Sequence, residues 1–161
     1  MPMRPTFWAT WPVSQYSVPR CVESWAGGLG WFMILLAGIS GNFINAAFLK
    51  TGHLSIGAST AIFGAIGILA GHQFIERFRL PGQRMKAWLP LAGGIALLGF
   101  LGSGAHTDLT AHLFGFLSGL ALAIIKDVFF KHPLTSIGQN FFMVLFAGVL
   151  AAAWVTGFSH G

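Results

Sequence analysis

Charged residues interrupt this sequence so rarely that it divides into five long stretches without any Asp, Glu, Lys or Arg. Nine residues are Lys or Arg and four are Asp or Glu, in a chain of 161 residues that is 55% hydrophobic. The uncharged stretches are 24–49, 51–75, 87–107, 109–125 and 132–161. A helix needs about 20 consecutive apolar residues to cross the hydrocarbon core of a bilayer. The sequence therefore predicts an all-α, polytopic transmembrane helical bundle with five spanning helices.

Two other classes of protein fit this pattern less well. A transmembrane β-barrel would show segments of about 10 residues in which polar and apolar positions alternate, whereas these stretches are apolar on all sides. An excess of basic residues is also found in nucleic-acid-binding proteins. Here, however, the basic residues lie in short segments between apolar stretches, where they orient the helices. We therefore expect the lipid bilayer as a partner, and no nucleic acid.

The placement of Lys and Arg predicts the orientation of the helices. If the N-terminal tail is cytoplasmic, eight of the nine basic residues lie on the inner side: Arg4, Arg20, Arg77, Arg79, Arg84, Lys86, Lys126 and Lys131. Only Lys50 lies outside, in agreement with the positive-inside rule. We expect a multi-pass protein of the cell (inner) membrane, with an inner loop at 76–86 that anchors the topology. The alternative for this loop is the binding of anionic lipid.

The chain divides into three parts. Residues 1–24 contain four prolines, spaced too closely for a helix interior, and are expected to form an interfacial N-terminal tail. Residues 25–126 would form a core of four spanning helices. Residues 127–161 would form an inner loop followed by an additional C-terminal spanning helix.

Polar residues within or at the ends of membrane spans are candidates for function because they are costly to bury there. They are Asn42, Asn45, Ser55, Ser59, His72, Asp108, His112 and Ser118. The second and fourth spans both enter from the outer side, so Ser59 and His112 each lie about one turn inside the membrane, at ~1.5 Å per residue. A serine hydroxyl becomes a good nucleophile when a nearby imidazole takes its proton. The two residues are therefore candidates for a catalytic dyad.

Helical periodicity places this pair on faces that can meet. Ser59, Phe63 and Gly67 share one stripe of the second span, and His112, Gly115 and Gly119 share one stripe of the fourth. Small residues at a four-residue spacing allow two helix backbones to approach closely. If the stripes containing Gly67, Gly115 and Gly119 pack together, the serine faces the histidine.

Two segments resemble the rhomboid intramembrane serine proteases. Gly41-Asn42 followed by HLSIGASTAIFGAIG at 53–67 is similar to the helix that carries the rhomboid nucleophile, and DLTAHLFGFLSG at 108–119 is similar to its histidine helix. The resemblance covers roughly residues 30 to 126. Both motifs occur in the family's order, separated by one apolar span and a basic inner loop.

The resemblance implies a mechanism and a substrate class. Ser59 would attack the scissile carbonyl, His112 would act as general base and then as general acid, and no third acidic residue, cofactor or metal would be required. Phe63 would lie against the imidazole. Gly57, Ala58 and Thr60 would shape the oxyanion site, to which the Ser59 backbone N–H would donate. The expected substrates are single-span membrane proteins, cleaved near their outer ends.

Two departures from the family pattern keep an alternative open. The nucleophile is usually followed by glycine, but here Thr60 follows it. Rhomboids also have two further helices upstream, the second of which carries a His and an Asn four residues apart that complete the oxyanion hole; no histidine here has Asn at that spacing. We therefore expect an upstream extension with two more spans. The alternative is a rhomboid-like pseudoprotease that binds membrane-protein helices without cleaving them.

The other polar residues have simpler explanations. Asp108 would be a helix N-cap rather than a third catalytic residue, and Asn42 and Asn45 would form interhelical hydrogen bonds rather than donate to the oxyanion. The remaining histidines lie in loops, at the terminus or near the inner surface, on both sides of the membrane, so no metal centre is expected. A haem-binding or structural membrane subunit is a further alternative, weakened because His72 and His112 lie at opposite depths.

Overall fold

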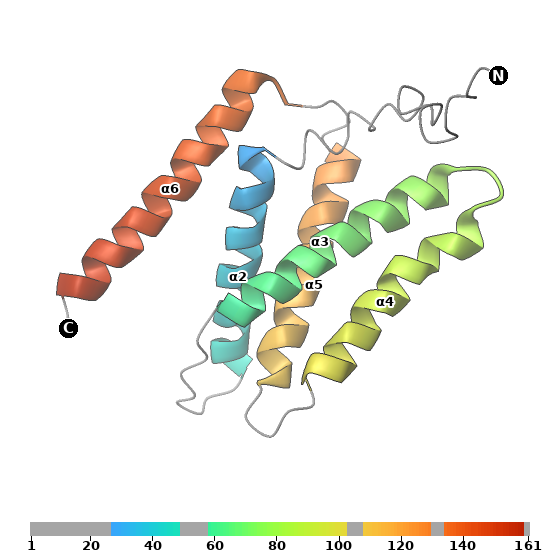
Figure 1. The fold of residues 1–161 in the computed structure, drawn as a ribbon, viewed down its shortest axis with the longest axis horizontal. Helices are drawn as coiled ribbons and strands as arrows, with labels where there is room; N and C mark the ends of the chain where they lie inside the picture. Colours follow the sequence, from blue (N-terminus) through green and yellow to red (C-terminus); the bar gives the residue numbers. More distant parts are fainter. Residues whose placement is uncertain (1–26, 49–57, 103–107, 130–133, 160–161) are drawn as a thin grey trace, which may run out of the picture.

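The structure is a computed structural model that describes residues 27–48, 58–102, 108–129 and 134–159. These residues form five helices and no strand, which confirms the predicted all-α class. The helices are α2 (Gly28–Phe48), α3 (Ala58–Arg79), α4 (Arg84–Gly102), α5 (Leu109–Phe129) and α6 (Ser136–Ser159). Figure 1 shows them as one bundle in which α3 and α5 cross near the centre.

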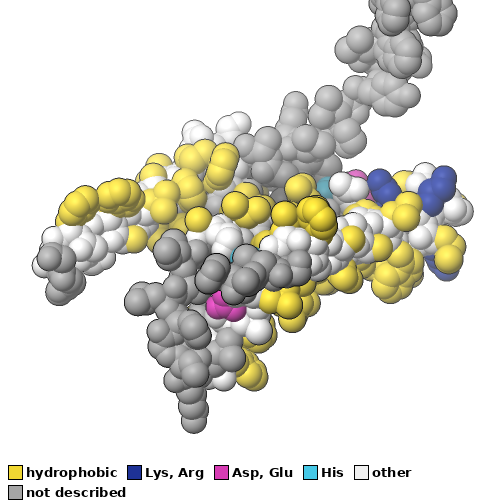
Figure 2. Space-filling model, turned by 60° about the horizontal axis from the view of Figure 1, so that its bottom comes forward, with side chains coloured by type: hydrophobic (Ala, Val, Ile, Leu, Met, Phe, Trp, Pro, Cys, Tyr) yellow, Lys and Arg dark blue, Asp and Glu magenta, His cyan; other side chains and the backbone are white. Residues whose placement is uncertain are grey.

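Four of these helices, α2, α3, α5 and α6, are long and apolar enough to cross a membrane. The fifth predicted span corresponds to α4, which does not meet the same criterion; its first turn contains Arg84 and Lys86, and Pro90 lies inside it. The chain is therefore an integral multi-pass membrane protein. Figure 2 shows apolar side chains over much of the visible face, while Lys and Arg gather at one end.

The α3–α4 connection is shorter than the inner loop predicted at 76–86. Helix α3 continues to Arg79 and α4 begins at Arg84, so only a four-residue turn separates them. Gly82 has a positive φ of 74° there, a conformation that glycine adopts without steric cost. Similarly, α5 continues beyond residue 126, where we expected the core to end, as far as Phe129.

The core lies where α2, α3 and α5 meet. One buried cluster consists of Met33, Ala37, Ile68 and Ala123, and a second consists of Phe63, Ala70 and Phe116. Helix α4 lies against α3 on one flank. On the other flank, α6 packs mainly on α2 and has no buried residue. Figure 1 shows α6 close to α2 near its own start and leaning away from it toward its end.

Glycines allow α3 and α5 to touch backbone to backbone. A Cβ atom added to Gly67 would overlap the carbonyl of Phe116, and one added to Gly119 would overlap the carbonyl of Gly64. A Cβ on Gly71 would lie 3.0 Å from the Cβ of Ala123. The glycine stripes predicted to pack together therefore lie in this interface, which positions the residues at the start of both helices.

Candidate functional site

The candidate site lies at the end of the bundle where α3 and α5 begin and α2 ends, called the site end below (Figure 1). Ser59 is in the first turn of α3 and His112 in the first turn of α5. Thr60, the neighbour of Ser59, is fully buried. Its methyl group would lie 2.8 Å from a Cβ on Gly41 and 2.9 Å from a Cβ on Gly115. Three helices thus meet at the residue that follows Ser59.

An aromatic ring holds the imidazole of His112. The rings of Phe63 and His112 stack with centroids 4.5 Å apart and planes inclined by 27°. Phe63 is 4% exposed and His112 is 6% exposed. Since Phe63 lies one turn after Ser59 on the same stripe of α3, the face that carries the serine also carries the ring that restrains the histidine.

Among the described residues, no hydrogen bond joins the side chains of Ser59 and His112. The Nδ1 atom of His112 is buried and has no hydrogen-bond partner, while Ser59 is half-buried. Stacking on Phe63, rather than hydrogen bonding, is therefore the observed restraint on the imidazole ring.

Asp108 acts as the N-cap of α5, as the sequence predicts. Its Oδ1 atom accepts the Ala111 N–H at 3.1 Å, and its carbonyl oxygen accepts the His112 N–H at 3.2 Å. The Thr110 hydroxyl lies 2.6 Å from Oδ1. This hydrogen bond, assisted by those from the Ala111 N–H and Asn45, lowers the pKa of Asp108 despite opposing desolvation. The carboxylate makes no hydrogen bond to the imidazole, so it does not act as the third member of a triad.

The two asparagines predicted to form interhelical hydrogen bonds differ. Asn45 of α2 donates to Asp108 Oδ2 at 2.9 Å, and its Oδ1 atom lies 2.8 Å from the Thr110 hydroxyl. For Asn42 the described residues supply no such hydrogen bond at Oδ1, which is buried without a partner, and the prediction stays a prediction. Sequence reasoning did not single out Thr110; its position two residues after a cap Asp was the available signal.

The remaining predicted site residues are placed as follows. Ala58 begins α3 and is exposed, and Gly115 packs against the carbonyl of Thr60. Gly57 lies outside the described residues. In the described ranges, no group of three His, Cys, Asp or Glu residues is arranged to hold a metal ion.

A second polar cluster lies at the opposite end of α3 and α5. His72 Nδ1 lies 2.7 Å from Asp127 Oδ2, and Lys126 Nζ lies 3.1 Å from Asp127 Oδ1. Glu76 is 3.7 Å from His72, and Arg79 donates to the Asp127 carbonyl at 3.1 Å. Sequence reasoning placed His72 near this surface but did not identify Asp127 as its partner. This cluster is separate from Ser59 and His112.

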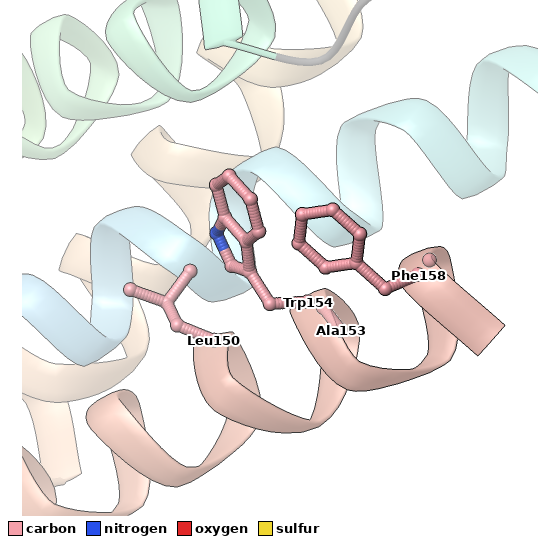
Figure 3. Close-up of a pocket in the computed structure, with 5 residues that line it drawn as sticks. Leu150, Ala153, Trp154 and Phe158 are labelled. Carbon is pink, nitrogen blue, oxygen red and sulfur yellow. The ribbon is translucent and has the colours of Figure 1, made fainter. Parts of the chain in front are cut away.

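An apolar depression on α6 is also separate from the site. It is lined by Leu150, Ala153, Trp154, Gly157 and Phe158. Figure 3 shows the rings of Trp154 and Phe158 side by side on one face of this helix. All of its lining residues come from α6, and none of them is titratable. It therefore adds no chemical group to the candidate site.

The fold and the site define a polytopic helical membrane protein in which a serine and a stacked histidine occupy the first turns of two tightly packed helices. A family model described as the Rhomboid domain matches residues 13–127. The chain belongs to the rhomboid family, and this confirms the resemblance found in the sequence.

Two named proteins are similar to the chain. The chain is 32% identical over 156 residues to "Inactive rhomboid protein 2" of Homo sapiens, covering 87% of this chain and 17% of that protein. It is 30% identical over 93 residues to "RHOMBOID-like protein 1" of Arabidopsis thaliana, covering 58% of this chain and 23% of that protein. The chain thus spans less than a quarter of either relative's length. No solved structure gave a significant match.

Proposed function

We propose that this chain is an intramembrane serine endopeptidase that cleaves peptide bonds in or beside the transmembrane segments of single-span membrane proteins. Ser59 is the nucleophile and His112 is the general base. One observation carries the proposal: Phe63 stacks on the imidazole of His112 at 4.5 Å, in the turn of α5 that leads into the Gly115 contact with Thr60. Stacking and helix contact together support the pairing, because they hold the imidazole against Phe63, one helical turn after Ser59.

The reaction follows from these two side chains. The Ser59 hydroxyl oxygen attacks the scissile carbonyl carbon while His112 accepts the hydroxyl proton, which gives a tetrahedral intermediate with a negatively charged oxygen. His112 then passes that proton to the leaving amine as the C–N bond breaks, leaving an ester on Ser59. Water attacks this ester with His112 again acting as base, which releases the new carboxyl end and restores Ser59.

The start of α3 supplies donors for the negatively charged oxygen. Backbone N–H groups in the first turn of a helix have no acceptor within that helix, and the positive end of the helix dipole lies there. The N–H of Ser59 belongs to this turn, and Gly57, Ala58 and Thr60 surround it in sequence. One preorganised donor aimed at an oxyanion contributes roughly 3 kcal/mol to transition-state stabilisation.

The membrane arrangement is part of the proposal. All five helices cross the membrane, α4 included, and the N-terminal tail lies on the cytoplasmic side of the cell (inner) membrane. The site end then faces outward, and water reaches Ser59 from that side. The exposed Arg79, Arg84 and Lys86 at the α3–α4 turn support this orientation, because basic residues concentrate on the cytoplasmic side.

A second candidate function is that of a pseudoprotease that binds membrane-protein helices without cutting them. Two observations favour it. One relative is named an inactive rhomboid, and no hydrogen bond joins Ser59 to His112 among the described residues. This candidate predicts helix binding without nucleophilic reactivity at Ser59.

The two functions are separated by a serine-reactive phosphonate applied to the detergent-solubilised full chain. The protease requires covalent labelling that disappears in Ser59→Ala and in His112→Ala. Ser118→Ala is the matched control, since Ser118 is also half-buried and lies on α5; it should label like the parent chain. A well-folded parent chain that does not label contradicts the protease and leaves the pseudoprotease.

A further inference from the structure

A polar link between α2 and the start of α5 lies at the site end. It consists of Asn45, Asp108 and Thr110, called the polar clasp below. Asn45 is 5% exposed and donates to Asp108 Oδ2 at 2.9 Å. The Thr110 hydroxyl lies 2.8 Å from Asn45 Oδ1 and 2.6 Å from Asp108 Oδ1. The clasp joins residues more than sixty positions apart in the sequence.

The clasp is connected directly to the backbone of the histidine. Two consecutive backbone N–H groups donate to Asp108. The Ala111 N–H donates to its carboxylate at 3.1 Å, and the His112 N–H donates to its carbonyl oxygen at 3.2 Å. These hydrogen bonds set the geometry of the first turn of α5. That turn determines the direction in which the His112 side chain leaves the helix.

Among the described residues, the imidazole ring has no polar restraint of its own. In a serine triad, a carboxylate bonds the histidine ring and fixes its orientation. Here the buried Nδ1 atom of His112 has no hydrogen-bond partner, and the ring is held by stacking on Phe63. Stacking restrains the tilt of the ring but allows sliding in its own plane. Control of that position must come from the backbone that carries the ring.

We propose that Asn45, Asp108 and Thr110 are positioning residues for His112: they orient the catalytic imidazole through its backbone, with α2 as the fixed reference. This inference rests on the proposed function. In a serine triad, a carboxylate orients the imidazole by bonding the ring. Here the Asp108 carboxylate would orient the imidazole from one helical turn away, through the backbone. The part played by Asn45 is to hold Asp108 in place from a different helix.

The donors and acceptors of the clasp suggest a specific exchange. The Asp108 carboxylate accepts from the Asn45 amide, the Thr110 hydroxyl and the Ala111 N–H. In Asp108→Asn, an amide donor replaces one of these acceptor oxygens and faces another donor. Adding Asn45→Asp restores the pairing in reverse: the new amide at position 108 donates to a carboxylate on α2, while its oxygen still caps α5. Asn and Asp are about equally good N-caps.

The test measures the rate of phosphonate labelling, together with kcat and KM for a single-span substrate, in the full chain. Asp108→Asn and Asn45→Leu should each lower the labelling rate and kcat by roughly ten- to a hundredfold, the scale of loss when a reacting group is misplaced by about 1 Å. KM should be unchanged. The exchange variant, Asn45→Asp with Asp108→Asn, should recover most of the rate.

Thr135→Ala is the matched control for the loss of a helix cap. The Thr135 side chain caps α6 by accepting the Gly138 N–H at 3.4 Å, and α6 packs mainly on α2. Its loss should leave the labelling rate unchanged at a temperature well below unfolding. If the exchange variant labels as slowly as Asp108→Asn, or if Asp108→Asn labels like the parent chain, the clasp does not position His112.

A second readout does not depend on catalysis. Spin labels are attached to cysteines introduced by Ala47→Cys and Leu109→Cys, both at exposed positions, after Cys21→Ser removes the chain's own cysteine. They report the distance between the end of α2 and the start of α5. The distance distribution should broaden in Asp108→Asn and narrow again in the exchange variant. If the parent chain does not react with the phosphonate but the spin-label distances change as expected, the proposed function is overturned and the clasp is retained. An unchanged distribution would overturn the clasp itself.

Discussion

The phenyl ring of Phe63 and the imidazole of His112 stack face to face, with centroids 4.5 Å apart. This contact joins the two helices that share the largest interface of the bundle. Thr60, on the same helix as Phe63, packs against Gly41 and Gly115. Among the described residues, the Nδ1 atom of His112 has no hydrogen-bond partner, so the contact that the imidazole ring itself makes is the stacking on Phe63.

Replacing Phe63 should reduce reactivity more than stability. In Phe63→Leu the core keeps most of its apolar volume, so the free energy of unfolding should fall by less than about 1.5 kcal/mol. The stacked surface is lost, however, and phosphonate labelling of Ser59 should slow by tenfold or more. Labelling rates and thermal unfolding in detergent would test this.

The matched control for this prediction is Phe116→Leu. Phe116 belongs to the same buried cluster and is equally inaccessible, 3% against 4% exposed, but it does not stack on His112. It should lose similar stability and keep its labelling rate. Equal slowing in both variants would mean that general core packing, and not the stacked ring, sets reactivity.

Much of this fold could be predicted from where charge is absent. The helices lie within or close to the five uncharged stretches, but α3 and α5 continue past the charged residues at which their stretches end. Helix α3 includes Arg77 and Arg79, and α5 includes Lys126 and Asp127. A helix continues through charged residues when they lie near a surface or pair with one another, so composition alone extended the α3–α4 loop too far.

The candidate site was predictable only in part. Helical period and depth predict that Ser59 and His112 lie at one level, because both follow from sequence spacing, and each residue lies in the first turn of its helix. The partner of Asp108 was not predictable, because it depends on the rotation of α2 about its own axis. A span that is apolar on all sides does not reveal that rotation. Asn45 therefore faces a hydrogen-bonding partner, whereas Asn42, three residues earlier, has none at its buried Oδ1.

Adding a methyl group at the α3–α5 contact should separate the helices. In Gly119→Ala the new Cβ would overlap the carbonyl of Gly64. Because this carbonyl belongs to the backbone of α3, it cannot move aside without shifting the helix. We expect a loss of roughly 1–3 kcal/mol in the free energy of unfolding and slower labelling of Ser59. Gly99→Ala on α4, where nothing lies within 4 Å, should be neutral or stabilising by up to about 1 kcal/mol. Equal stability of the two variants would contradict the contact.

The buried hydroxyl of Thr60 should be dispensable. Within the part of the chain that the structure describes, its Oγ1 atom has no hydrogen-bond partner, and the side chain is fully buried. Thr60→Val keeps the methyl group that contacts Gly41 and Gly115 and removes an unsatisfied polar atom. The free energy of unfolding should therefore rise, by about 1 kcal/mol. Thr110→Val is the contrasting variant. Because the Thr110 hydroxyl is hydrogen-bonded, its removal should make the chain less stable than the parent chain. A destabilised Thr60→Val would show that this hydroxyl is satisfied.

Acid should weaken the cap of α5. The hydrogen bond from Thr110, together with those from the Ala111 N–H and Asn45, lowers the pKa of Asp108 below 3.8. A carboxyl group whose pKa is lower in the folded state stabilises the fold above its unfolded pKa and loses this contribution as the pH falls through the folded value. Thermal unfolding measured from pH 6 down to about 3 should show a fall in stability that is smaller in Asp108→Asn. Identical pH profiles would contradict this assignment.

The cluster at the opposite end should govern stability without affecting the site. Asp127, 7% exposed, accepts from Lys126 at 3.1 Å and lies 2.7 Å from His72 Nδ1. Asp127→Ala removes the acceptor that Lys126 and His72 share, and hydrogen bonds to charged groups contribute about 1.5–3 kcal/mol each. We expect a loss of that order in the free energy of unfolding, measured by thermal unfolding in detergent.

The control is Glu76→Gln, at a half-exposed position 3.7 Å from His72, which should change the free energy of unfolding by less than about 0.5 kcal/mol. Because Ser59 and His112 lie at the other end of α3 and α5, the labelling rate should be unchanged in both variants well below their unfolding temperatures. Slower labelling in folded Asp127→Ala would instead show that the two ends of these helices are coupled.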